Sequence, residues 1–460
     1  MGQVNASQKG EENPVHIGGH NQNLDTETAE CNTCSQLSCI IVGGGQRGWN
    51  YASYALDHPE KMKIIAICDP SVYVQKKFAK TYGIGNDNIF SDWTDVIKLK
   101  KFADFVCICT PDHLHKEVAV SFAKLKYHIL LEKPMATSKE DCIEIVKICA
   151  ENEVMISVCH VLRYYPPNKK IKELIDSGEI GDVVSIQHIE PVGYWHFAHS
   201  YVRGNWRNTA KSSFSLLAKS CHDIDLFCYW IDSPCKAVSS FGSLKHFIPK
   251  NKPIGGGMRC LDCSVEEKCP YSAKKVYLDL TSEKGYFGFP VSVVSDVEDC
   301  ASVAECIANG PYGRCVYECD NDVCDNQVVN LQFQNGVTVS FTMVAFSEEI
   351  CKRTTRIFGT LGEIKYFGGV TVEHFDFLSG KSHSYNCHPV EAMFSKHLRG
   401  HGGADFYLID SFIKAVQAND PSLIQSGPEE TLQSHLLVFA CEESRLKNKT
   451  LHFSDNEWSP

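Results

Sequence analysis

Short apolar runs and amphipathic stretches alternate along the first third of the chain. The apolar runs, which are typical of buried strands, lie near residues 39–42, 64–68, 104–109, 128–131 and 154–158. Stretches with helical periodicity separate them, including those near 113–125 and 138–150. Because helices separate successive strands, the pattern predicts a doubly wound parallel sheet with helices on both faces.

The rhythm changes beyond residue 165. A helix is expected over about 168–177, and the later strand candidates follow one another without the helices that parallel crossovers require. These candidates lie at 183–188, 236–243, 327–334, 336–345, 354–358 and 370–376. Helices near 214–231, 404–418 and 428–446 would cover one face. The pattern therefore predicts a second, α+β domain on a large, mostly antiparallel open sheet.

The 460 residues divide into a tail and two domains. Residues 1–36 are poor in large apolar side chains, so a disordered tail is expected. Residues 37–162 form the predicted α/β domain, and residues 163–460 form the predicted substrate and oligomerisation domain. A Gly- and Cys-rich insertion at about 249–325 interrupts the second domain.

The first apolar run leads directly into Gly43-Gly44-Gly45-Gln46-Arg47-Gly48. In G-x-G-x-x-G the first glycine makes the tight turn, the second lets backbone approach a pyrophosphate, and the third packs helix against strand. The next run ends in Asp69, about twenty residues further on, where a carboxylate would bind an adenosine ribose. The pattern predicts a Rossmann domain for NAD rather than NADP, because a 2′-phosphate would face a like charge.

Composition narrows the function classes. A net charge of -11 and a pI near 5.9 argue against a nucleic-acid surface. The chain has neither a run of eighteen apolar residues nor a signal peptide pattern, so a cytoplasmic protein without a transmembrane segment is expected. Gly2 opens an approximate acylation signal that has Ala6 where Ser or Thr is usual, which leaves a weak N-terminal lipid anchor open.

Two further apolar runs end in polar motifs, Cys109-Thr110-Pro111 and Glu132-Lys133-Pro134. Proline stops each strand, so Thr110 and Lys133 would face the crevice where a dinucleotide lies. A lysine there can stabilise a developing alkoxide. The alternative is a solvated loop lysine.

Taken together, these motifs make residues 38–445 resemble the Gfo/Idh/MocA family of sugar and cyclitol oxidoreductases. The matching residues are Gly43-x-Gly45-x-x-Gly48, Asp69, Cys109-Thr110-Pro111-x-His113-x-His115, Glu132-Lys133-Pro134, Arg163-Tyr164-x-Pro166 and Ser177-Gly178-x-Ile180-Gly181. The resemblance implies that Lys133 contacts both cofactor and substrate. The other expected cofactor residues are Gly43, Gly45, Gln46, Arg47, Gly48, Asp69, Thr110, Pro111, His113, His115 and Glu132.

The resemblance also assigns a catalytic histidine, His222, whose imidazole would exchange the substrate hydroxyl proton. The alternative is a core histidine with no chemical role. Many family members carry an aspartate four residues earlier, but this chain has Ala218 there, followed by Lys219. The usual Asp/His relay is therefore in doubt, and Lys219 is a third catalytic candidate beside Lys133 and His222.

Aromatic rings with polar tips crowd residues 193–208. Such a mixture suits a polyhydroxylated ring, although it also suits an aromatic domain interface. The predicted substrate-binding residues are Arg163, Trp195, His196, His199, Trp206, Arg207 and Asp223.

The insertion carries three cysteines with metal-ligand spacing, Cys260, Cys263 and Cys269. Either Cys315 or Cys319 could supply a fourth thiolate for a structural zinc. A disulfide or free thiols are the alternatives. A catalytic zinc is not expected, because a thiolate-rich set makes a closed site.

The motifs and the resemblance together predict an NAD-dependent oxidoreductase that acts on a secondary hydroxyl of a sugar, sugar derivative or cyclitol and forms homo-oligomers. One alternative enzyme is a glycosidase that oxidises, eliminates and re-reduces without net cofactor use. A second alternative is a regulator that binds dinucleotide without catalysis.

Overall fold

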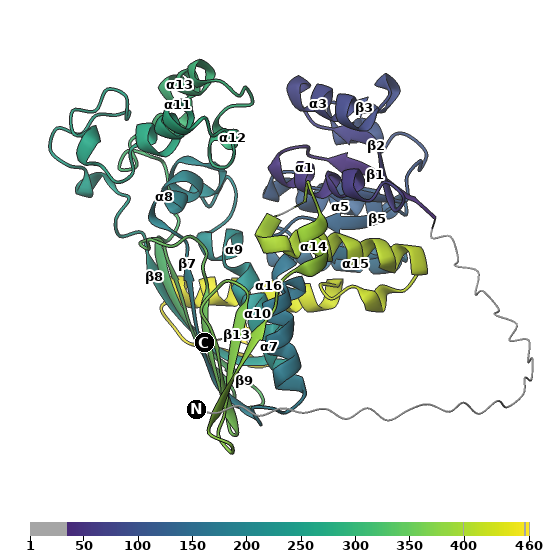
Figure 1. Cartoon of the computed structure of the whole chain (residues 1–460), viewed down its shortest axis with the longest axis vertical. Helices are drawn as coiled ribbons and strands as arrows, with labels where there is room; N and C mark the ends of the chain where they lie inside the picture. Colours follow the sequence, from purple (N-terminus) through teal and green to yellow (C-terminus); the bar gives the residue numbers. More distant parts are fainter. Residues whose placement is uncertain (1–34, 399, 455–456, 460) are drawn as a thin grey trace, which may run out of the picture. The chain divides into compact units, whose positions relative to one another are not determined.

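The computed structural model describes residues 35–398, 400–454 and 457–459. The Gly2 acylation signal and all but the end of the predicted tail lie outside the described residues. Figure 1 shows the first sheet with its helices, the second sheet with helices α7, α10 and α16 beside it, and the helices of the insertion.

The first sheet has six parallel strands in the order β3-β2-β1-β4-β5-β6. The central strands are apolar throughout because helices cover both faces, and every residue of β4 is buried. The strands are β1 Leu37–Val42, β2 Met62–Cys68, β3 Ile89–Phe90, β4 Phe105–Ile108, β5 His128–Leu131 and β6 Ile156–Val158. This sheet confirms the predicted doubly wound α/β domain.

Helices connect these strands. Ser71 and Ser138 begin two of the helices by accepting a hydrogen bond from a first-turn backbone N–H, as N-cap serines do. The helices are α1 Gln46–Ala52, α2 Tyr54–Asp57, α3 Val72–Tyr82, α4 Trp93–Val96, α5 His115–Lys124 and α6 Lys139–Glu151.

The second sheet has ten strands in the order β14-β13-β12-β11-β7-β10-β9-β8-β15-β16. Strands β7 and β10 pair in parallel and the other paired strands run antiparallel, which confirms the mostly antiparallel prediction. The strands are β7 Val183–Pro191, β8 Cys235–Ser243, β9 Asn326–Phe333, β10 Thr338–Val344, β11 Thr354–Gly359, β12 Gly362–Tyr366, β13 Thr371–Asp376, β14 Lys381–Asn386, β15 Leu451–Ser454 and β16 Glu457–Ser459.

Long helices pack against this sheet and against the first domain. Helix α16 contacts β8 of the second sheet and α6 of the first domain, and α15 contacts α1. The helices outside the insertion are α7 Pro166–Asp176, α8 Tyr194–Phe197, α9 Ser215–Ala218, α10 Cys221–Ile231, α14 Val390–Phe394, α15 Ala404–Ala418 and α16 Pro428–Lys447. The single helix predicted over 214–231 was wrong: it divides after Ala218 into α9 and α10, and His222 lies in the first turn of α10.

The insertion between β8 and β9 folds around a small core of its own. Tyr277 and Ile307 are fully buried members of that core. The helices are α11 Asp279–Lys284, α12 Val291–Val294 and α13 Cys300–Asn309, which gather in one region of Figure 1. Within the described residues no helix has the length and apolarity that a membrane crossing requires.

Candidate active site

The turn after β1 has the geometry that a pyrophosphate cradle needs. Gly43 has φ +93°, and a Cβ there would stand 2.5 Å from the Cys109 carbonyl oxygen. At Gly48 a Cβ would stand 2.0 Å from the Gly43 carbonyl oxygen, so helix and strand approach too closely for a side chain. At Gly45 a Cβ would meet no heavy atom within 4 Å. Gly45 and Gln46 are exposed, so this turn leaves open space for a phosphate group.

Asp69, at the end of β2, lies directly beside this turn. Its Oδ2 accepts a hydrogen bond from the Gly44 backbone N–H at 2.8 Å, and its Oδ1 accepts one from the Ser71 N–H at 2.8 Å. The glycine turn and the strand-end carboxylate are therefore held together, as a site for a pyrophosphate and a ribose requires.

The loops after β4 and β5 are joined by His115. Its buried ring lies 2.7 Å from the Pro134 carbonyl oxygen through Nδ1 and 2.9 Å from the Thr110 carbonyl oxygen through Nε2. This histidine, predicted as a cofactor contact, therefore has both ring nitrogens occupied by the protein. His113 is exposed, and Thr110 Oγ1 is buried without a hydrogen-bond partner in the described chain.

Arg47 connects the glycine turn to both domains. Its Nε contacts Glu132 at 2.6 Å, and its Nη1 contacts Asp405 at 2.8 Å. Burial alone would raise the pKa of Glu132, but Arg47 and then Lys133 hold it below its ordinary value. Asp405 also lies 2.8 Å from Nδ1 of His401. The guanidinium therefore has structural partners, whereas the sequence motif had suggested a cofactor contact.

The second domain brings His222 close to Lys133. Lys133 Nζ donates a hydrogen bond to the Ala218 carbonyl at 2.6 Å, one turn before His222. Burial, followed by the charge of Lys133, holds the pKa of His222 well below its ordinary value. His222 is therefore neutral at neutral pH and can accept a proton. Its Nδ1 is buried without a hydrogen-bond partner among the residues described.

Two further histidines, His160 and His401, lie beside His222, and the sequence analysis had not singled out His160. The His160 ring, which follows β6, lies 5.5 Å from the His222 ring, and the His401 ring lies 6.2 Å away. Burial lowers the pKa of His160 to about 3, so its ring is also neutral. These residues come from separate segments of the chain, and a position next to the strand end was the only available sequence signal for His160.

Lys219 lies in a buried charge network with Cys351 and Glu190. Its Nζ lies 2.9 Å from Cys351 Sγ and 3.4 Å from Glu190 Oε1. Burial alone would lower the pKa of Lys219, but Cys351 and Glu190 raise it above the ordinary range. Lys219 is therefore a fixed cation rather than a proton acceptor, and its contacts do not support a catalytic role.

Arg163 and Asp223 also have protein partners in place of the predicted substrate. Arg163 forms a bidentate pair with Asp225, with distances of 2.7 and 2.9 Å. Asp223 Oδ1 lies 2.5 Å from Nε of Arg353 and 3.1 Å from Nε2 of His188. The contacts of Arg163 and Asp223 do not support the substrate role that the sequence predicted for them.

The aromatic segment 193–208 joins the insertion to the first domain. Trp206 Nε1 donates to Asp112 at 3.0 Å, which ties the segment to the loop after β4. The His199 ring stacks on Tyr312 of the insertion at 4.9 Å, and its Nδ1 lies 2.9 Å from the Tyr277 hydroxyl. These contacts correspond to the domain-interface alternative for this segment.

The remaining predicted substrate residues of this segment, Trp195, His196 and Arg207, differ in burial and in their contacts. Trp195 and His196 are partly buried, and both rings lie near Phe289. Burial lowers the pKa of His196 to about 3. Arg207 forms a partly exposed ion pair with Asp320 at 2.7 Å. His196 Nδ1 also lies 3.5 Å from Cys351 Sγ, so of these two residues only Trp195 has no hydrogen bond to another side chain in the described part of the chain.

These features define a class of protein: a two-domain oxidoreductase whose first domain binds a dinucleotide. The chain belongs to the Gfo/Idh/MocA family. Residues 37–160 match the family described as "Oxidoreductase family, NAD-binding Rossmann fold", and residues 172–453 match "Oxidoreductase family, C-terminal alpha/beta domain". This membership confirms the family resemblance. It also confirms the prediction that the chain is an NAD-binding oxidoreductase.

Individual relatives are more distant. The chain is 25% identical over 324 residues to the putative oxidoreductase YteT of Bacillus subtilis, covering 67% of this chain and 71% of YteT. It is 30% identical over 210 residues to the 2,7-anhydro-N-acetylneuraminate hydratase of Escherichia coli, covering 45% of this chain and 54% of the hydratase. The structure of levoglucosan dehydrogenase in complex with NADH is similar, with a TM-score of 0.67 and 18% identity over 91% of this chain and 99% of that one.

Proposed function

We propose that this protein transfers a hydride between NAD and a secondary hydroxyl of a sugar, sugar derivative or cyclitol. The observation that carries the proposal is the position of Lys133. Its ammonium reaches the segment that precedes His222, and its charge helps to keep that imidazole neutral. A cation and a neutral base side by side are what alcohol oxidation requires.

Each group then has a distinct task. Lys133 would bind the substrate oxygen and stabilise negative charge as it develops there. His222 would accept the hydroxyl proton in oxidation and return it in reduction. Bound NAD would supply the hydride acceptor. The lowered pKa of His222 leaves its imidazole unprotonated at neutral pH, so a ring nitrogen is free to receive the hydroxyl proton.

The residues around the glycine turn fit the cofactor. The open space at Gly45 would take the pyrophosphate, and Asp69 would bind the adenosine ribose. The position of Asp69 supports NAD over NADP, since its carboxylate would repel a 2′-phosphate. The unpartnered hydroxyl of Thr110 is a further candidate donor to the cofactor.

The test is the substitution Lys133→Met, with turnover and NAD affinity measured separately. We expect kcat to fall by about a hundredfold to ten-thousandfold on an active polyol, because a transition-state charge loses its partner. NAD affinity should change little. The matched control is Lys100→Met, which removes an exposed lysine of the same domain. Unchanged kcat in Lys133→Met would exclude the proposed mechanism.

A second candidate is the redox-neutral cycle of oxidation, elimination and re-reduction. The similarity to an enzyme named a hydratase favours it, since that name describes no net redox change. Release of aglycone from a glycoside panel with less than one NAD per turnover would establish this cycle. A strict need for stoichiometric NAD would exclude it.

Self-association is part of the proposal. Phe241, Val328 and Ile189 are 57%, 36% and 44% exposed. Phe241 on β8 pairs with Val328 on β9, and Thr342 on β10 pairs with both Val328 and Ile189 on β7. The three apolar side chains and Thr342 therefore form one row across four neighbouring strands. Such a row supports pairing with a second copy of the chain.

A further inference from the structure

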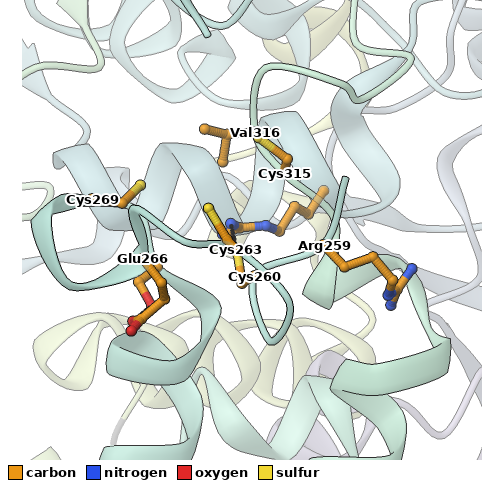
Figure 2. A pocket seen from close by; sticks show the side chains of 9 residues that line it. Arg259, Cys260, Cys263, Glu266, Cys269, Cys315 and Val316 are labelled. Carbon is orange, nitrogen blue, oxygen red and sulfur yellow. Dashed lines mark hydrogen bonds between the residues drawn. The ribbon is translucent and has the colours of Figure 1, made fainter. Parts of the chain in front are cut away.

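The insertion brings four thiols to one small hollow. Cys260, Cys263 and Cys269 line it from one segment, and Cys315 lines it from a distant loop, as Figure 2 shows. The hollow measures about 20 Å³. That volume accommodates a particle about the size of one water molecule and excludes an organic ligand.

Each of the four sulfurs already accepts an N–H hydrogen bond. The backbone N–H of Gly257 donates to Cys263 Sγ at 3.3 Å. The backbone of Tyr271 donates to the Cys269 sulfur, and the backbone of Tyr317 donates to the Cys315 sulfur. In both of these bonds the donor lies two residues after the cysteine. Donors aimed at sulfur stabilise thiolates, and such outer contacts orient the ligands of metal sites.

Arg203 supplies the fourth sulfur with a charged donor. Its Nη2 lies 3.3 Å from Cys260 Sγ, and its guanidinium is fully buried without a carboxylate among its hydrogen-bond partners in the described chain. A buried cation without an anionic partner is costly. Four thiolates around a divalent cation carry a net charge of minus two, so a metal site would supply the negative charge that Arg203 lacks.

The geometry also distinguishes between the two candidates for the fourth ligand. Cys315 lines the hollow, whereas the Cys319 sulfur contacts the Cys315 carbonyl oxygen at 3.3 Å and does not line it. Sequence spacing alone could not separate these two cysteines. No disulfide joins cysteines in the part of the chain that the structure describes.

We propose that Cys260, Cys263, Cys269 and Cys315 bind one structural zinc ion, with Arg203 as the charge-balancing neighbour. Among the described residues no three ligands already stand at metal-binding distances, so the thiols must turn inward on binding. Four S–H bonds are then replaced by four sulfur–metal bonds, and the protons pass to solvent. The site is closed, which fits a structural ion rather than a catalytic one.

The ion would hold the aromatic segment in place. Arg203 belongs to the helical turn Ala198–Arg203, three residues before Trp206, which bonds to Asp112 of the first domain. A metal at the hollow would therefore join both ends of the insertion to the segment that reaches the proposed active site. This inference stands independently of the proposed hydride transfer.

The test measures metal in the full-length protein purified under reducing conditions. We expect about one zinc per chain, released by a mercurial reagent that modifies thiols. Cobalt in place of zinc should give a thiolate charge-transfer band and the visible spectrum of a tetrahedral site. Cys315→Ser should weaken zinc binding at least about tenfold, whereas the matched control Cys319→Ser should bind as the parent does.

The remaining outcomes refute the proposal. A chain that holds no zinc or cobalt after anaerobic reconstitution has no such site. Equal losses in Cys315→Ser and Cys319→Ser would exclude the assigned ligand set. Should Cys315→Ser fail to fold, Cys263→Ser and the cobalt spectrum of the parent decide the question. NAD binding measured on the same samples separates a failure here from a failure of the proposed function.

Discussion

The pair between Arg163 and Asp225 makes a sharp prediction, because the sequence motif and the structure give Arg163 different roles. Arg163 is 4% exposed and Asp225 is 1% exposed. Arg163→Met leaves a buried carboxylate without its cation, which typically costs about 3–5 kcal/mol of unfolding free energy. Two unit charges about 4 Å apart attract by about 4 kcal/mol at an effective dielectric constant of 20, which agrees with this range.

Urea unfolding followed by circular dichroism measures the loss. With a slope of about 4 kcal/mol per molar, a loss of 4 kcal/mol moves the midpoint down by about 1 M. The double variant Arg163→Met with Asp225→Asn should recover about 1–2 kcal/mol, because the buried charge is gone. The control Lys172→Met removes an ion pair with the half-exposed Asp176 and should cost less than about 1 kcal/mol.

The opposite pattern would refute this reasoning. If Arg163→Met unfolds as the parent does while KM for the substrate rises about tenfold or more, Arg163 binds substrate as the sequence motif suggested. A large loss of stability with an unchanged KM assigns the residue to the domain junction instead.

Two further predictions concern pH and cofactor choice. Burial lowers the pKa of His160 from 6.5 to about 3. Below pH 6.5 the unfolded chain therefore binds a proton at this residue that the folded chain does not bind. The free energy of unfolding should fall as the pH is lowered from 6.5. Between pH 6.5 and 5 this amounts to about 2 kcal/mol, and His160→Gln should remove that part of the pH dependence of urea midpoints. Asp69→Ala should weaken NAD binding, measured by calorimetry, by about tenfold to a hundredfold. The same substitution should reduce the ratio of NAD affinity to NADP affinity. Equal NAD affinity in the variant would place the ribose elsewhere.

The fold followed from periodicity where strands are buried or alternate clearly. The five long apolar runs of the first domain all became strands, because burial on both faces demands apolar residues throughout. Most strands that periodicity missed lie at or next to a sheet edge, but β12 lies inside the second sheet between β11 and β13. β14, an edge strand of the second sheet, is mostly exposed and polar. The two-residue β3, at an edge of the first sheet, is too short to show a pattern.

The site was harder to predict than the fold, because its contacts join distant segments. The glycine turn and Asp69 are local features whose spacing fixes their geometry, and both lie where the motif placed them. Arg163, His199 and Lys219 carry groups suited to a sugar, but the fold supplies each with a protein partner first. The sequence shows which functional group a residue carries. It does not show which residue, distant in the chain, binds that group in the folded protein.

One cation links the parts that the proposed reaction needs together. Arg47 follows the glycine turn directly, and its guanidinium bonds Glu132, whose other oxygen accepts the backbone N–H of Lys133. The same guanidinium bonds Asp405, which holds His401 beside the ring of His222. A planar guanidinium can make these directed bonds at once, which a lysine ammonium cannot match in geometry. The turn proposed to hold the pyrophosphate is therefore mechanically connected to both groups proposed to handle the proton, although they come from three separate segments of the chain.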